Sequence, residues 1–162
     1  GCSIGVLSHY FVNKDEIVIA AMNWADENIE QRFTDLIANS PMETDQYMPF
    51  IMENMPLSEQ SELEWRVRLN LAAYSLTHPV LKQSQDEQRA IRNERLVGML
   101  KQLQASGNMR ADFVPDILAQ NLTDFMIGTA YNLLNHPMEE RADKLQFVAL
   151  YLAALSGDDD QA

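Results

Sequence analysis

The first twenty residues constrain the fold more than any other stretch, because single side chains in them mark the starts of two helices. Ser3 is a good N-cap, and Gly1 before it can adopt the positive φ of a tight turn, so a short helix is predicted from Ser3 to about Tyr10. Asn13 caps a second, longer helix, and Glu16 follows three residues later, as a capping box requires. A short helix, a turn and a long helix in this order are typical of the back half of a helix-turn-helix unit.

The short helix carries side chains suited to DNA. The reading helix of such a unit lies in the major groove, with polar side chains near its start. Gly5 allows the backbone to approach DNA closely, Ser3 can offer its hydroxyl or amide to a phosphate, and Lys14 in the next helix can reach another phosphate. The residues that we expect at the DNA are Ser3, Gly5, Ser8, His9, Tyr10 and Lys14.

These residues resemble the signature of the TetR (tetracycline-repressor-like) family of transcription regulators. The signature stands here as Gly1-Cys2-Ser3, Ile4-Gly5-Val6-Leu7, Ser8, His9-Tyr10-Phe11 and Lys14-Asp15-Glu16. Cys2 replaces the usual Val and Ser8 the usual Tyr, and the second change falls at a position where the resemblance implies a DNA contact. The run from Ser8 to Phe11 is similar to the choline-responsive repressors of betaine synthesis within the family.

The resemblance implies an all-α, TetR-like protein with distinct parts. We expect the end of a DNA-binding domain and a connecting helix over 1–39, a helical effector-binding and dimerisation domain over 40–157, and a disordered acidic tail over 158–162. The family has two further helices before this point, and Gly1 is not an initiating Met. We therefore expect a processed, truncated or partly observed chain. The implied partners are operator DNA, a second copy of the chain and a small-molecule effector that releases a repressor from its operator.

Apolar residues spaced three and four apart predict helices along the rest of the chain, and prolines separate them. No strand pattern stands out. The helices that we expect cover 13–39, 43–55, 58–78, 79–105, a segment from 112 or 114 to the break at 135–137, and a last helix that closes at 156–157.

The resemblance places an effector pocket between the central helices, where helical proteins offer apolar cavities. Trp65, Tyr74 and Phe125, with Asp124, could form an aromatic cage for a quaternary ammonium ligand, and neutral apolar ligands fit equally well. The candidate pocket residues are Trp65, Leu69, Asn70, Tyr74, Met99, Asn121, Phe125 and Met126.

The resemblance also implies that the last two helices pair with their copies as a four-helix bundle. Small side chains in these helices permit close approach, and a two-fold dimer presents two reading heads to half-sites roughly 34 Å apart. The expected interface residues are Leu122, Gly128, Leu133, Leu145, Val148, Ala149 and Leu152.

The net charge of −12 opposes DNA if it is averaged over the chain. The acids concentrate between residues 43 and 64 and in the tail, so the charge would leave DNA binding to one tip. An alternative is a helical module that binds a basic partner through its acidic surface, which leaves the pattern of residues 1–16 unexplained. A single cysteine fits a reducing cytosol, and no apolar run approaches the roughly 20 residues of a membrane span, so we expect a cytoplasmic protein without a membrane partner.

The sequence does not suggest an enzyme. His9, His78 and His136 are isolated, and none of them follows a Glu by three residues. Adjacent Ser8 and His9 point in different directions on a helix, and neither a zinc spacing nor a Gly-rich phosphate loop occurs. We therefore expect no catalytic residue, no metal and no cofactor.

Overall fold

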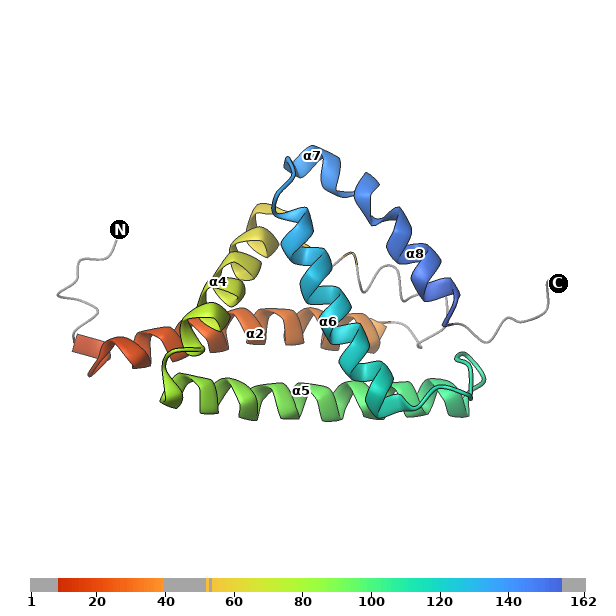
Figure 1. Cartoon of the computed structure of the whole chain (residues 1–162), viewed down its shortest axis with the longest axis horizontal. Coiled ribbons are helices and arrows are strands. Elements are labelled where there is room, and N and C mark those ends of the chain that lie inside the picture. Colours follow the sequence, from red (N-terminus) through yellow and green to blue (C-terminus); the bar gives the residue numbers. More distant parts are fainter. Residues whose placement is uncertain (1–8, 40–51, 53, 156–162) are drawn as a thin grey trace.

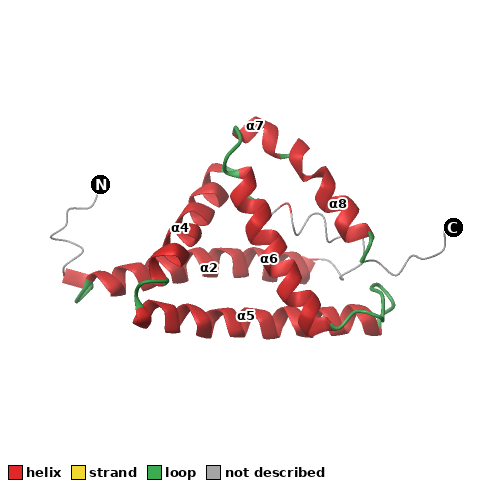
Figure 2. Ribbon diagram, viewed as in Figure 1, coloured by secondary structure: helices red, strands yellow, loops and turns green. Residues whose placement is uncertain are grey.

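The structure is a computed structural model, and it describes residues 9–39, 52 and 54–155. No strand occurs in the described part, which confirms the all-α prediction (Figure 2). Its helices are α2 (Lys14–Asn39), α4 (Glu59–Ser75), α5 (Pro79–Ala105), α6 (Pro115–Leu133), α7 (Met138–Arg141), the 3₁₀ turn η2 (Asp143–Leu145) and α8 (Gln146–Ala153). The expected short helix at 43–55 and the acidic tail lie largely or wholly outside the described residues.

Capping side chains begin α2 and α4 where the sequence places them. The Asn13 Oδ1 atom accepts a hydrogen bond from the Glu16 amide at 2.9 Å, and the Glu16 carboxylate accepts one from the Val12 amide at 2.8 Å. Ser58 caps α4 and exchanges side-chain-to-backbone hydrogen bonds with Ser61, which forms a capping box. Both starts are fixed by residues within four positions of each other, so local sequence is enough to predict them.

Prolines and one glycine bound the next two helices. Pro79 opens α5 and Pro115 opens α6, each within the first turn, where a missing amide hydrogen costs nothing. Gly107 follows the end of α5 with φ of +79°, a conformation that favours glycine. Both helices therefore begin as predicted, and α5 also ends at the predicted residue.

The end of the chain differs from the single last helix that was expected. A short α7, the turn η2 and α8 follow one another after Pro137. The break comes directly after Arg141, whose side chain is buried and donates hydrogen bonds to the carbonyl oxygens of Pro56 and His136. These contacts hold α7 against the start of α4, and the chain turns again to begin α8.

Figure 1 shows how the helices are arranged. The long helices α2 and α5 run side by side, and α4 rises from one end of this pair. From the far end of α5, α6 crosses back over α5 and runs up to the start of α4, where α7 lies, and α8 then descends along a third side. The packing of α2 on α4 and of α4 and α6 on α5 joins these sides into one body.

The core of this body divides into three clusters of buried side chains. The Trp65 cluster comprises Met55, Trp65, Ala130, Leu133, Leu145 and Val148. The Leu100 cluster comprises Val97, Leu100, Leu103, Met109, Leu118, Ala119 and Leu155. The Leu81 cluster comprises Val18, Met22 and Leu81. The last cluster attaches the first half of α2 to α5.

Candidate functional site

The end of the chain that precedes α2 exposes two of the side chains expected at DNA. His9 and Tyr10 lie in a helical turn, and 74% of Tyr10 is exposed. Their rings meet edge to face with centroids 5.5 Å apart. The other expected contacts in the short helix, Ser3, Gly5 and Ser8, lie outside the described residues.

Lys14 connects this end to the body. Its ammonium nitrogen lies 4.8 Å from the centroid of the Tyr74 ring, and Tyr74 stacks on His78 with centroids 3.7 Å apart. The Lys14 side chain is exposed, and a cation–π contact at an exposed site is worth only about 0.5–1 kcal/mol. The ammonium group can therefore leave Tyr74 at little cost and reach a phosphate.

Half of the expected pocket residues gather at the Trp65 cluster. Trp65 is 4% exposed, and its indole nitrogen donates a hydrogen bond to the Asn54 carbonyl oxygen at 2.6 Å. Leu69, Phe125 and Met126 pack against the same cluster. The sequence therefore identified an apolar group from α4 and α6 that the fold brings together.

The other expected pocket residues lie elsewhere. Tyr74 packs against the Leu81 cluster and Met99 against the Leu100 cluster. Asn70 and Asn121 are exposed, and the Asn70 amide is occupied by the Arg66 carbonyl oxygen at 2.7 Å. Asp124 is exposed as well, so the structure does not assemble the aromatic cage suggested by Trp65, Tyr74, Phe125 and Asp124. Adjacent residues on a helix are rotated by about 100°, so Asp124 and Phe125 lie on different faces of α6.

The expected interface residues also divide between interior and surface. Leu133, Leu145 and Val148 are at most 1% exposed within the single chain, because they belong to the Trp65 cluster. Leu122 is half-buried against the Leu100 cluster, whereas Gly128 is exposed and a Cβ added there would meet nothing within 4 Å. The side chains of Ala149 and Leu152 lie outside the described part of the structure.

Large apolar side chains remain exposed on the outer faces of α6 and α8. Ile117 and Tyr131 on α6 are 59% and 62% exposed, and Phe147 and Leu150 on α8 are 48% and 75% exposed. Gly128 lies between the two residues of α6 at helical spacing. The Phe125 ring lies 5.9 Å from Phe147 and 4.4 Å from Tyr151 between centroids, so it joins α6 to α8. These exposed residues were not predicted from the sequence, although their helical phase opposite the buried leucines was a usable signal.

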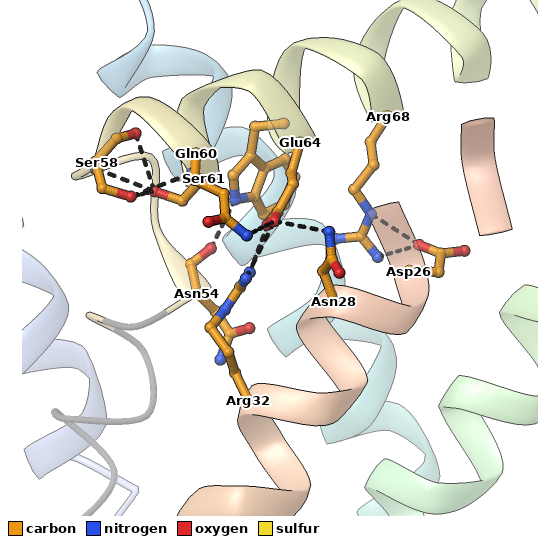
Figure 3. A network of polar contacts seen from close by, with 10 residues as sticks. Asp26, Asn28, Arg32, Asn54, Ser58, Gln60, Ser61, Glu64 and Arg68 are labelled. Atoms are coloured by element: carbon orange, nitrogen blue, oxygen red, sulfur yellow. Dashed lines mark hydrogen bonds and ion pairs between the residues drawn. The ribbon is translucent and has the colours of Figure 1, made fainter. Parts of the chain in front are cut away.

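A polar network between α2 and α4 was not anticipated from the sequence (Figure 3). The Glu64 side chain is fully buried, and it accepts hydrogen bonds from Asn28 at 3.2 Å and Gln60 at 3.1 Å. Arg32 adds a two-pronged ion pair at 3.2 and 2.6 Å. A buried carboxylate needs such partners, because an unpaired charge in the interior costs several kcal/mol. Beside this network lies a polar groove of about 450 Å³ that is lined by Asn28, Gln31, Arg32, Ser58, Gln60 and Ser61.

Asp26 forms a second polar centre, which lies about one and a half helical turns closer than Arg32 to the start of α2. Its Oδ1 atom accepts hydrogen bonds from the Arg68 Nε and Nη2 atoms at 2.9 and 2.7 Å, and its Oδ2 atom pairs with Arg92 of α5. Burial lowers the pKa of Arg68, and the neighbouring Asp26 carboxylate opposes that shift. Arginine nevertheless stays charged in proteins, so this is a true ion pair. A further pair joins Glu30 of α2 to Arg95 of α5.

Nowhere among the described residues do three His, Cys, Asp or Glu side chains lie close enough to share a metal ion. None of the helices in the described part of the chain is long and apolar enough to cross a membrane.

Comparison with known proteins points to one family. The family model described as "BetI-type transcriptional repressor, C-terminal", of the TetR group, matches residues 44–157. The HTH-type transcriptional regulator PksA of Bacillus subtilis (strain 168) is 24% identical to this chain over 153 residues, which are 93% of this chain and 72% of PksA.

Proposed function

Because this chain belongs to the TetR family of transcriptional regulators, with a C-terminal domain of the BetI type, we propose that it is a homodimeric repressor that a small molecule releases from operator DNA. The continuity of α2 carries the proposal. This helix of 26 residues, ~39 Å long at 1.5 Å per residue, begins beside the exposed Tyr10 and extends into the polar network of the body. A change in the body is therefore delivered to the reading end without an intervening loop.

The mechanism is a shift between two populations of the dimer. An effector that binds more tightly to one spacing of the two heads moves the dimer toward that spacing. If that spacing does not match the two half-sites, the affinity for the operator falls. We expect this regulator to act in the cytoplasm, with DNA contacts from Ser3, Gly5, Ser8, His9, Tyr10 and Lys14.

The effector would bind beside the Trp65 cluster. Leu69, Phe125 and Met126 come together with Trp65 there, and they offer an apolar, aromatic surface with a flexible methionine. Choline and a panel of neutral apolar compounds are the two classes of ligand to test. The separation of Tyr74 and Asp124 from this group supports the neutral class.

The dimer would form through the outer faces of α6 and α8. The exposed Ile117, Tyr131, Phe147 and Leu150 supply apolar area, and Gly128 lets a second helix approach closely. Exposed apolar surface of this kind on neighbouring helices marks association sites in soluble proteins. The interface residues expected from the sequence that face inward would then support this surface from beneath.

Operator selection with the full-length protein tests the proposal. Randomised duplexes should yield an inverted repeat with half-site centres about one helical turn apart. Tyr10→Ala should then weaken binding to that duplex about tenfold, the loss expected for one or two DNA contacts, while the sedimentation coefficient of the dimer stays unchanged. Glu27→Gln, at an exposed position on α2, is the matched control.

Two outcomes would contradict the proposal. Absence of any sequence preference in the selection would remove the repressor function and favour the acidic module that binds a basic partner. Loss of the dimer in Tyr10→Ala would place Tyr10 in the structure of the protein rather than at the DNA.

A further inference from the structure

We propose that Asp26 is a positioning residue that clamps α2 to both α4 and α5 and thereby sets where the DNA-reading end stands. The inference rests on the proposed function, and it names the residue through which the body would hold the head. Asp26 contacts no ligand or DNA in this proposal. It acts through Arg68 and Arg92.

The position of Asp26 supports this role, because three helices meet at its carboxylate. One oxygen pairs with Arg68 from α4 and the other with Arg92 from α5. The Asp26 and Arg68 side chains are 20% and 21% exposed, whereas Arg92 is 42% exposed. The ion pair with Arg68 is therefore better shielded from solvent, whereas the ion pair with Arg92 is open to water and breaks more easily.

The contacts of α2 change character at this residue. Between the reading end and Asp26, Val18 and Met22 attach α2 to Leu81 by apolar packing. Beyond them the described contacts with α5 include two ion pairs, from Asp26 to Arg92 and from Glu30 to Arg95. Apolar packing tolerates small rotations, whereas a carboxylate held by two guanidinium groups fixes an angle. Asp26 is the first such fixed point along α2 from the reading end.

Arg68 also links this clamp to the proposed effector site. Its guanidinium carbon lies 5.2 Å from the centroid of the Trp65 ring while its nitrogens hold Asp26. A ligand that moves Trp65 would disturb Arg68 directly, and Arg68 would pass the change to α2. The route from Trp65 through Arg68 to Asp26 consists of adjacent contacts, and each of them joins charged or aromatic groups with a preferred geometry.

A small rotation at Asp26 is enough to matter. Lys14 precedes Asp26 by twelve residues, or ~18 Å along the helix axis. Rotation of α2 by about 5° around Asp26 would therefore move the reading end by about 1.6 Å. In a two-fold dimer both heads move, so the change in spacing is up to about twice this value.

The test compares Asp26→Asn with Glu27→Gln in the full-length dimer. Both substitutions remove one negative charge from α2, but Glu27 is exposed and only Asp26 bridges two arginines. Amide hydrogen exchange of α2 should become about fivefold or more faster in Asp26→Asn, while α6 exchanges at the wild-type rate. Affinity for the selected operator should fall about five- to tenfold. Asp26→Glu, which keeps the charge, should restore part of both losses.

A second pair of variants separates the clamp from general stability. Arg68→Gln should reproduce part of the faster exchange of α2, and the double variant with Asp26→Asn should be no worse than Asp26→Asn alone, because Asp26→Asn already removes the ion pair with Arg68. Arg92→Gln should act in the same direction, and Arg89→Gln on the exposed side of α5 should not.

The proposal is wrong if the amides of α2 exchange at the same rate in Asp26→Asn and Glu27→Gln. It is also wrong if Asp26→Asn raises the exchange rate equally in α2 and α6. Amide hydrogen exchange tests the role of Asp26 in the absence of DNA. Failure of the wild-type protein to select an operator would therefore remove the proposed function, while the exchange of α2 would still decide whether Asp26 holds this helix.

Discussion

Replacing Arg141 by alanine removes a side chain that joins α7 to the segment before α4. Arg141 is 3% exposed, and its Nη1 atom donates to the Pro56 carbonyl oxygen at 2.8 Å and to the Glu62 carboxylate at 2.7 Å. Its Nε atom donates to the His136 carbonyl oxygen at 3.0 Å. The substitution leaves two carbonyl oxygens without this donor and opens space in the interior.

The expected loss of stability follows from these contacts. A hydrogen bond to a charged group contributes about 1.5–3 kcal/mol, and breaking a buried ion pair costs about 3–5 kcal/mol. Glu62 is 21% exposed and keeps Arg66 as a partner, so the loss should fall near the lower end of the second range. We expect the free energy of unfolding to decrease by about 3 kcal/mol in Arg141→Ala.

Arg66→Ala is the matched control, because Arg66 pairs with the same carboxylate from an exposed position. A surface pair of this kind contributes about 0.3–0.5 kcal/mol. Urea unfolding of wild type and both variants, at one fixed protein concentration, measures the difference. Equal losses in the two variants, or a loss below about 1 kcal/mol in Arg141→Ala, would refute the argument from burial.

Three further predictions concern the surface, the acid response and the effector. Leu150→Glu should dissociate the proposed dimer in sedimentation experiments, whereas Leu76→Glu, at an equally exposed leucine (75%) directly after α4, should not. The hydrogen bonds from Arg66 and then Arg141 lower the pKa of Glu62, so its ionised form contributes stability above its ordinary pKa and this contribution is lost as the pH falls through the folded pKa. Glu62→Gln should therefore destabilise the protein at pH 7, and its difference from wild type in thermal unfolding should shrink as the pH falls through the lowered pKa of Glu62. Trp65→Phe, which removes the indole hydrogen bond, should shift the effector concentration that releases operator at least about fivefold, and an unchanged titration would exclude Trp65 from the effector site.

Helix boundaries could be predicted because they depend on neighbouring residues. Ser58 and its bond to Ser61, Pro79 at the start of α5 and Pro115 at the start of α6 each act within one turn. The all-α class could be predicted from the same signals. The break after Arg141 could not be predicted, because it accompanies contacts with Pro56 and Glu62, which lie more than seventy residues away in the sequence.

The orientation of the last helices could not be predicted from periodicity alone. A helix that packs on its own body and on a second subunit carries apolar residues on two faces, and their spacing does not say which face turns inward. Leu133 and Tyr131 illustrate the difficulty, since the first is 1% and the second 62% exposed although they are two residues apart. Only the packing of α6 against Trp65 decides between the faces.

The surface charge of the acidic stretch could not be predicted either, because it also depends on contacts between distant residues. Glu64 counted as one of the acids that would repel DNA, yet it is fully buried and paired with Arg32. Asp26 likewise has no neighbour in sequence that reveals Arg68 or Arg92, which follow 42 and 66 residues later. Ion pairs between distant residues leave no periodic signal in the sequence. The contacts of Glu64 and Asp26 are therefore visible only in the folded structure.

These pairs change the electrostatic argument about DNA. Eight of the twelve basic residues form ion pairs within the described part of the chain. Of the four others, Arg89, Lys101 and Lys144 lie on α5 or after α7, far along the chain from the reading end, and Lys14 stands next to it. Phosphate affinity depends on cations that are free to displace counterions, so the body has few to offer. Under the proposed function, the affinity for an operator would come from the residues before α2 and from Lys14, so the position of α2 would be the variable that the body controls.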